Sequence, residues 1–520
     1  MAEPETNSEE IKPSETEEKP SEIETKPAEP ASVVDEAPKA QLTAAQKKRQ
    51  KKKNKKLRDK AEGEQDKHGD EDDGDDVDDK CEEKETKDDQ KSEKKDEKPI
   101  EKEKEKDVEQ KKQGNEPKKG NPNPSVEIKR KDGVTLPNLE YGAQPGQKFY
   151  QTMPPTITIS QQFPKHKYPF GKIEAYKDDN TTHRFTDLRR KAEESMSESI
   201  YNDFRQAAEA HRQLRAYARQ SLKPGVKLYD WVADLEKRGR NILGENANTH
   251  TKVGHAFPTG LSLNNCAAHY TPNPGDDRVL EKGDVVKVDI GLHVNGHIID
   301  SAFSMCFDDQ FQPLIESSRE GTYTGLREAG VDARIAEIGA SIEETISSYE
   351  CEIGKKTFKI KPVSNLTGHQ VGDYLVHFGK SVPLIHNGTD PSLRMEEGDF
   401  FAIETFGTTG KGRVIDQPDC SHYMMAPGAM GKINTLRNQS AKQLLNFING
   451  HFKTLAWCKR WLHEWGETKY ALALKQLVDS ELVHPYPPLS DHAGSYVSQH
   501  EHTVAIKPTG KEIFSFGEDG

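Results

Sequence analysis

Residues 285–303 decide the fold; they read Val285-Val-Lys-Val-Asp-Ile-Gly-Leu-His-Val-Asn295-Gly296-His-Ile-Ile-Asp-Ser-Ala-Phe303. Apolar and polar side chains alternate on both sides of the Asn295-Gly296 pair, and alternation with a period of two is typical of a half-buried strand. Asn-Gly is the strongest short signal for a two-residue β-hairpin turn. The stretch therefore predicts two antiparallel strands joined at Asn295 and Gly296.

The register of this hairpin brings two aspartates together. If Asn295 and Gly296 form the loop, Gly291 lies opposite Asp300. Asp289 lies two residues from Gly291 and on the same face, because strand side chains repeat every two residues. Asp289 and Asp300 are then diagonal cross-strand neighbours, roughly 7–8 Å apart at the backbone and within reach of one shared ligand.

Two carboxylates placed in this way repel each other unless a cation lies between them. One alternative is that both aspartates point to solvent, as is common on antiparallel sheets. The flanking Val, Ile and Phe residues instead indicate a mostly buried hairpin, where carboxylates are rare unless paired or coordinated. Taken alone, the pair leaves both interpretations open.

Further candidate ligands lie in similar surroundings. His369 ends the polar turn that begins at Asn365, and His377 follows eight residues later. Glu404 and Glu501 each lie inside an apolar, strand-like segment. Each alone is more often a satisfied polar residue than a ligand. Together with the aspartate pair they supply four carboxylates and an imidazole, a set suited to two divalent ions.

The two ends of the chain differ sharply in composition. Of 520 residues, 32% are apolar and 31% are charged, but most of the charge precedes residue 140. A Lys/Glu/Asp-rich tail over residues 1–140 cannot bury enough apolar surface to offset its ordering entropy, so we expect it to be disordered. Its basic block, residues 47–56, and acidic block, residues 66–79, fit three interpretations: a docking tail for RNA, ribosomes or a protein, a solvated tail without a partner, or a nuclear-import signal.

The rest of the chain has an ordinary globular composition. Residues 141–186 are rich in Pro, Gly and Thr and predict an extended lead-in, and 187–520 predict one folded region. Helical spacing recurs over 187–219 and 228–243, and again over 311–350 and 434–480. Neither a secretory h-region nor a run of roughly 20 apolar residues is present, so we expect no membrane association. Scattered cysteines without C-x-x-C spacing indicate reduced thiols and a cytoplasmic protein, and we expect no DNA partner.

Several of these segments resemble the motifs of one enzyme family, the type 2 methionine aminopeptidases of eukaryotes. The segments are Phe257-Pro-Thr-Gly260, Leu263-Asn-Asn-Cys-Ala-Ala-His-Tyr270, Val288-Asp-Ile-Gly291, Ile299-Asp300, Gly368-His369, Ala402-Ile-Glu-Thr-Phe-Gly407 and Glu501-His-Thr503. The resemblance implies an α+β pita-bread fold, a pseudo-two-fold antiparallel sheet flanked by helices, as the catalytic domain over 187–520. It also implies that 423–486 is a helical, winged-helix-like insertion, and the charged tail is similar to that of the family in composition.

The resemblance also assigns roles to the candidate ligands. Asp289 would chelate one metal, Asp300 and Glu501 would bridge both ions, and His369 and Glu404 would complete the other site. This ligand set admits Co, Mn, Fe or Zn, two ions per chain.

The same resemblance places residues around the substrate. Glu404 would act as general base, His269 matches a histidine beside the scissile bond, and His377 matches one that stabilises the tetrahedral intermediate. A further set falls where the family forms its methionine pocket: Phe257, Val376, His422, Ala456 and Tyr486.

The function implied is removal of the initiator methionine from nascent polypeptides with a small second residue. Family members associate with eukaryotic initiation factor 2, so the tail would serve that contact or ribosome docking. The main alternative is a non-enzymatic binding protein of the pita-bread fold that acts in translation or ribosome association, but such relatives lack several of the five ligands. A proline dipeptidase shares the ligands, and the helical insertion and the Asn264-Asn-Cys-Ala-Ala-His269 motif argue against it.

Overall fold

The computed structural model describes residues 151–519. The predicted tail, residues 1–140, and the first part of the predicted lead-in, residues 141–150, lie outside the described residues. The helices are α2 (Ile159–Gln162), α3 (Asp187–Met196), α4 (Glu198–Ser221), α5 (Leu228–Leu243), α6 (Gln312–Glu328), α7 (Ile335–Ser347), α8 (Gln439–His451), α9 (Lys459–Glu464) and α10 (Ala471–Asp479), with 3-10 turns η1 (Asn180–His183), η2 (Asp309–Phe311) and η3 (Ala429–Thr435).

The strands alternate with these helices along the chain. They are β1 (Lys172–Glu174), β2 (Val253–Leu263), β3 (Cys266–Ala268), β4 (Val285–Val294), β5 (His297–Cys306), β6 (Glu350–Ile353), β7 (Lys356–Lys359), β8 (Lys361–Pro362), β9 (Thr367–Gly372), β10 (Leu375–Pro383), β11 (Phe400–Thr408), β12 (Ile415–Asp416), β13 (His422–Met425), β14 (Trp457–Cys458), β15 (Val483–Tyr486), β16 (Leu489–Ser490), β17 (Val497–Lys507) and β18 (Gly510–Ile513).

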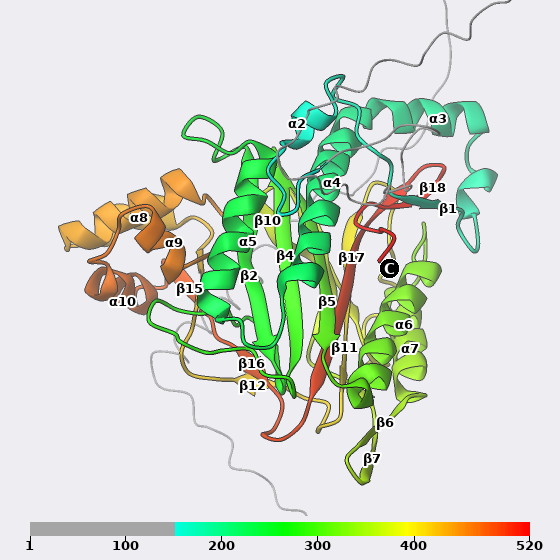
Figure 1. Cartoon of the computed structure of the whole chain (residues 1–520). Helices are drawn as coiled ribbons and strands as arrows, with labels where there is room; N and C mark the ends of the chain where they lie inside the picture. The colour runs from blue at the N-terminus through cyan, green and yellow to red at the C-terminus, as the bar shows by residue number, and fades with distance from the viewer. Residues whose placement is uncertain (1–150, 520) are drawn as a thin grey trace, which may run out of the picture. The chain divides into compact units, whose positions relative to one another are not determined.

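Two antiparallel sheets form the two halves of the fold. One has the order β2-β4-β5, and the other has the order β1-β18-β17-β11-β9-β10, with β8 beside β11. Helices α4 and α5 pack on β4, β5 and β2, while α6 and α7 pack on β17, β11 and β10 (Figure 1). Each half thus repeats the same arrangement of a helix pair on an antiparallel sheet, and each has its own apolar core.

The decisive hairpin has the predicted register. Gly291 pairs with Asp300 across β4 and β5, as the sequence predicts. Asn295 and Gly296 form the loop with positive φ values of 54° and 94°. Both loop residues of a type I′ turn need positive φ, which Asn and Gly adopt at low cost.

Side-chain hydroxyls join the two sheets between β5 and β17. Thr503 Oγ1 accepts a hydrogen bond from the Asp300 amide (2.8 Å) and donates one to the Asp300 carbonyl (2.7 Å). Ser301 donates to the Glu501 carbonyl (2.7 Å), and Ser304 donates to the Gln499 carbonyl (2.9 Å). These bonds satisfy buried backbone groups and fix the position of β5 along β17.

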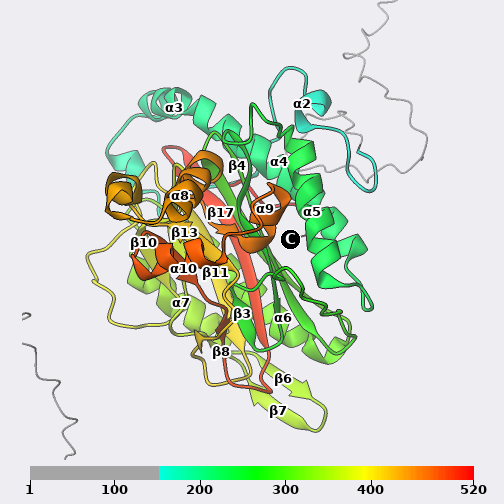
Figure 2. The same cartoon turned by 90° about the vertical axis from the view of Figure 1, so that its left-hand side faces the viewer.

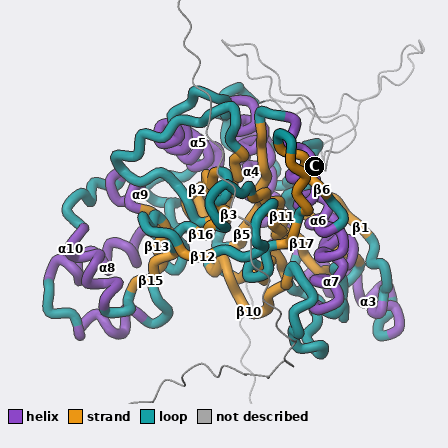
Figure 3. The backbone as a smooth tube through the Cα atoms, turned by 90° about the horizontal axis from the view of Figure 1, so that it is seen from below, coloured by secondary structure: helices purple, strands orange, loops and turns teal. Residues whose placement is uncertain are grey.

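The residues between His422 and Tyr486 form a small unit of their own. Strands β14, β13 and β15 make a short sheet, and α8, α9 and α10 gather beside it (Figures 2 and 3). This unit has a separate apolar core that includes Trp457 and Leu445. A fully buried ion pair connects it to α5, because Arg460 donates to Glu236 at 2.7 Å.

The structure differs from the expected secondary structure at two places. The helix expected over 187–219 is divided at Ser197, whose φ of −95° and ψ of 5° end α3 and begin α4. The lead-in is not extended throughout 151–186, because it contains the short helix α2 and the 3-10 turn η1. Within residues 151–519, no helix is long and apolar enough to cross a membrane.

Candidate metal centre

Five strands bring the predicted ligands onto one face of the joined sheets. Asp289 and Asp300 come from β4 and β5, as the hairpin register requires. Glu404 pairs directly with Glu501 across β11 and β17. His369 on β9 pairs with Ala402, two residues before Glu404, so its side chain lies on the same face.

The ligand atoms form two groups that share one residue. Asp300, His369 and Glu501 make one group, and Asp289, Glu404 and Glu501 make the other, with the atoms of each group within 4.8 Å of one another. His369 Nε2 lies 3.6 Å from Asp300 Oδ2 and 3.9 Å from Glu501 Oε1. Glu501 therefore lies where a bridging ligand is expected, whereas Glu404 lies with Asp289 and not with His369.

The four carboxylates stand in an unfavourable electrostatic position. Burial raises the pKa of Asp289 to about 7. Burial and the neighbouring acids raise the pKa of Asp300, Glu404 and Glu501 well above their usual range. Burial likewise holds the pKa of His369 well below its usual value, which keeps the imidazole neutral and able to coordinate.

Unpaired oxygen atoms indicate what the site is built to hold. Within residues 151–519, Asp289 Oδ1, Asp300 Oδ1 and both carboxylate oxygens of Glu501 are buried without a hydrogen-bond partner. Unpaired buried acceptors are costly, and divalent cations satisfy such oxygens while cancelling the repulsion between them. The donor set of four carboxylates and one neutral imidazole fits two divalent ions.

Gln499 is a member of this site that the sequence analysis missed. Its side-chain amide donates to Asp289 Oδ2 (3.1 Å) and to Glu404 Oε1 (2.6 Å). It lies two residues before Glu501 on β17, so the period of two places it on the same face. That alternation was the signal available in the sequence. The contacts make Gln499 a positioning residue for the two carboxylates that it joins.

His269 lies beside the site in a strained backbone conformation. It follows β3 with a φ of 63°, which non-glycine residues adopt at a cost that is often found at functional sites. Burial lowers its pKa to about 3, so the ring is neutral at physiological pH. Its ring centroid lies 6.0 Å from that of His422 and 5.9 Å from that of Tyr486.

The other predicted histidine lies beside the ligand candidate His369. His377, on β10, is exposed, and its ring centroid is 4.1 Å from that of the ligand candidate His369. The pKa of His269 is also lowered by the charge of His377, so the two rings are near enough to interact. Both predicted catalytic histidines therefore lie close to the metal-ligand candidate His369.

The predicted methionine-pocket residues form two connected sets. Phe257, Val376 and Ala456 belong to one small apolar cluster. The Phe257 ring packs on Gly291, where an added Cβ would lie 2.2 Å from a ring carbon, so only glycine fits opposite Asp300. The second set, His422 and Tyr486, pairs across β13 and β15, and His422 Nε2 donates to the Pro258 carbonyl next to Phe257 (3.2 Å).

Comparison with known proteins agrees with this geometry. Residues 202–431 match the sequence model of "Metallopeptidase family M24". Methionine aminopeptidase 2A of Arabidopsis thaliana is 49% identical over 369 residues, which cover 71% of this chain and 82% of the relative. Methionine aminopeptidase 2 of Dictyostelium discoideum is 47% identical with the same coverage of each chain. This chain belongs to the methionine aminopeptidase 2 family.

Membership in this family confirms the resemblance of the sequence motifs to type 2 methionine aminopeptidases, the α+β pita-bread fold and the enzyme class. The chain is a metal-dependent aminopeptidase that acts on the N-termini of its substrates and uses divalent ions. A solved structure of a thermophilic Arx1 has the same fold, with a TM-score of 0.51 and 16% identity over 60% of this chain and 89% of that one. The non-enzymatic alternative is not favoured, because the relatives at 47–49% identity are methionine aminopeptidases.

Proposed function

We propose that this chain removes the N-terminal methionine from newly made polypeptides whose second residue is small. The observation that carries the proposal is the pair of ligand groups that share Glu501, together with the apolar cluster that includes Phe257, Val376 and Ala456. A flexible, polarisable thioether side chain suits an adaptable apolar pocket of this kind.

Asp289, Asp300, His369, Glu404 and Glu501 would hold the two ions. When bound, divalent ions polarise a carbonyl and lower the pKa of water to near neutrality. An ion held there would also offer a binding site for the free amine of the substrate, which would restrict binding to chain ends. Glu404 is assigned as the general base, held in place by the hydrogen bond from Gln499.

His269 and His377 are assigned to contact the reacting carbonyl group of the substrate. A neutral imidazole carries one N–H, and His269 is kept neutral by its burial. Donation from His269 and His377 to the developing oxyanion would stabilise the transition state by about 2.7–4 kcal/mol per donor. Neither histidine needs to change its charge for this role.

The wider setting of the enzyme is also proposed. The proposed domain limits are 187–520 for the catalytic domain and 423–486 for the insertion, and the separate core around Trp457 supports the insertion. A cytoplasmic location agrees with free thiols at the described cysteines. Docking to ribosomes and to eukaryotic initiation factor 2 through residues 1–140 rests on the resemblance of that tail in composition.

A peptide assay tests the proposed activity. Protein reconstituted with Mn, Co, Fe or Zn is incubated with Met-X-Ser peptides in which X is Gly, Ala, Val, Leu or Phe, with a Leu-Gly-Ser control and with an Ala-Pro dipeptide. We expect methionine release only for small X, and no release of leucine. Release independent of the first residue contradicts the methionine assignment, and cleavage confined to an Ala-Pro dipeptide indicates a proline dipeptidase instead.

A further inference from the structure

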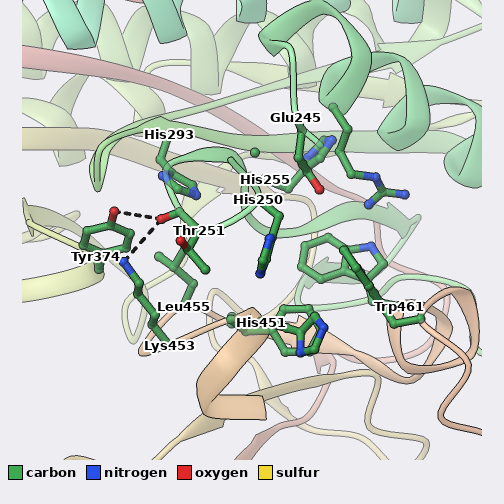
Figure 4. Close-up of a pocket in the computed structure, with 15 residues that line it drawn as sticks. Glu245, His250, Thr251, His255, His293, Tyr374, His451, Lys453, Leu455 and Trp461 are labelled. Carbon is green, nitrogen blue, oxygen red and sulfur yellow. Dashed lines mark hydrogen bonds between the residues drawn. The ribbon is translucent and has the colours of Figure 1, made fainter. Parts of the chain in front are cut away.

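A further pocket is lined in part by Ala456, one of the predicted methionine-pocket residues. It is enclosed by the end of α5, the segment that follows it, β2, β4, the β9–β10 turn and residues 451–465 (Figure 4). We call it the histidine pocket, after its residues His250, His255, His293 and His451. None of the proposed catalytic groups lies in it, and of the predicted methionine-pocket residues it includes Ala456.

Three of the imidazoles present hydrogen-bond acceptors in their neutral form. His250 and His451 each place Nδ1 against a backbone carbonyl, of Ala247 at 3.0 Å and of Phe447 at 2.9 Å. A carbonyl only accepts, so Nδ1 must carry the proton and Nε2 is left with its lone pair. His255 donates through Nε2 to the Glu236 carbonyl (3.0 Å), which leaves Nδ1 as its acceptor.

One buried acceptor lacks any donor in residues 151–519, and the half-buried carboxyl of Glu245 also lines the pocket. His255 is 7% exposed, and its Nδ1 is buried with no hydrogen-bond partner. Burial raises the pKa of Glu245 to about 7; Arg240 offsets this only in part, and no hydrogen bond to the carboxyl lowers it. Unsatisfied buried acceptors are uncommon, and each calls for an explanation such as a ligand.

The two cationic side chains that line the pocket, Arg240 and Lys453, already have partners. Arg240 donates to Glu464 at 2.7 Å. Lys453 donates to the Thr251 carbonyl (3.3 Å) and lies over the Tyr374 ring, 3.8 Å from its centroid. Figure 4 shows Lys453 and Tyr374 on one side of the pocket and Glu245 and Trp461 on the other.

The form of the pocket limits the ligand further. Its cavity is about 30 Å³, so it admits only a small group. Aromatic rings line it, with His451 and Trp465 4.7 Å apart and His250 and Trp465 5.5 Å apart between centroids. In the described residues the pocket's histidines and Glu245 do not converge closely enough to form a metal-ligand group. Dispersed acceptors beside aromatic faces suit a planar cation with several N–H donors.

We propose that the histidine pocket binds the guanidinium group of an arginine side chain, with the Glu245 carboxylate as its counter-ion. Arginine presents five N–H donors in a fixed plane and stacks on aromatic rings, whereas the lysine ammonium is a compact point charge. The site is separate from the metal centre, so its occupation does not depend on the proposed reaction.

Binding is measured on the metal-loaded full-length protein by calorimetry and by the fluorescence of Trp461 and Trp465. The probe is Nα-acetyl-arginine N-methylamide, whose blocked amine cannot enter the aminopeptidase site as a substrate does. The matching neutral probe is Nα-acetyl-citrulline N-methylamide, and the lysine analogue compares the two basic side chains. We expect saturable binding of the arginine probe, weaker binding of the lysine probe and none of the citrulline probe.

Two variants make the result specific to the pocket. Glu245→Gln keeps the shape of the side chain and should weaken arginine binding about tenfold or more, as loss of a charge-assisted hydrogen bond implies. Glu337→Gln removes an exposed glutamate that pairs with Arg334 elsewhere and should leave binding unchanged. The proposal is overturned by equal binding of citrulline, by unchanged affinity in Glu245→Gln, by equal losses in both variants, or by no saturable binding of the arginine probe.

Discussion

At the scale of single residues, Asp300 is one of the carboxylates on which the proposed metal centre depends. It is buried, it belongs to the ligand group of His369 and Glu501, and its Oδ1 has no partner within residues 151–519. We expect Asp300→Ala to lower methionine release by at least ~10²-fold, since even residues that only support a ligand cost 10–100-fold. Metal content measured by atomic emission should fall with activity, while the circular dichroism spectrum stays unchanged.

The control for this variant is Asp373→Ala, which removes an exposed carboxylate from the β9–β10 turn. It should keep full activity and metal content. An Asp300→Ala protein that retains both would show that the ligand assignment is wrong.

His269 gives a prediction that separates chemistry from metal binding. The ring donates no ligand atom to either group, so His269→Ala should keep its metal. Loss of one oxyanion donor should lower kcat about 10²–10³-fold with a smaller effect on KM. Steady-state kinetics and metal analysis of the same sample check both expectations, and loss of metal together with activity would count against the role.

Local signals in the sequence explain which parts of this site could be predicted. The hairpin register followed from Asn295-Gly296 and the period-two alternation, both of which act over a few residues. The contact of β5 with β17 could not be predicted in this way, because the bond from Ser301 to the Glu501 carbonyl joins residues 200 apart in sequence. The positive φ of His269 could not be predicted either, because neither Gly nor Asn, which favour positive φ, occupies that position.

At the scale of elements, a buried ion pair connects α5 to α9. Glu236 accepts hydrogen bonds from Arg460 (2.7 Å), from Trp461 Nε1 (2.6 Å) and from the Thr259 amide (2.9 Å). Glu236→Gln would leave the buried guanidinium without its counter-ion, and we expect the free energy of unfolding to fall by about 3–5 kcal/mol. Urea denaturation measures this free energy. The control is Glu193→Gln, in a surface pair with Arg189, which should change the free energy of unfolding by about 0.3–0.5 kcal/mol. A loss as small as that of the control would contradict the structural role.

The same pair predicts how stability depends on pH. Arg460 and the neighbouring donors lower the pKa of Glu236 from its ordinary 4.5 to about 2 in spite of burial. Because the folded pKa is the lower one, the stabilisation is complete above about pH 4.5 and is lost as the pH falls toward 2. Denaturation midpoints between pH 6 and 3 should therefore decline less steeply in Glu236→Gln than in the unchanged protein.

At the scale of the whole molecule, the proposed chemistry requires only the region from 187 onward. All proposed ligands, both histidines and the pocket residues lie between Phe257 and Glu501. Deletion of residues 1–140 should therefore leave kcat/KM on a Met-Gly-Ser peptide within about twofold, because no group that the mechanism uses is removed. If the tail docks to ribosomes, the same deletion should abolish co-sedimentation of the protein with them. A large loss of activity on the short peptide would show that the tail contributes to catalysis, and unchanged co-sedimentation would place the ribosome contact elsewhere on the chain.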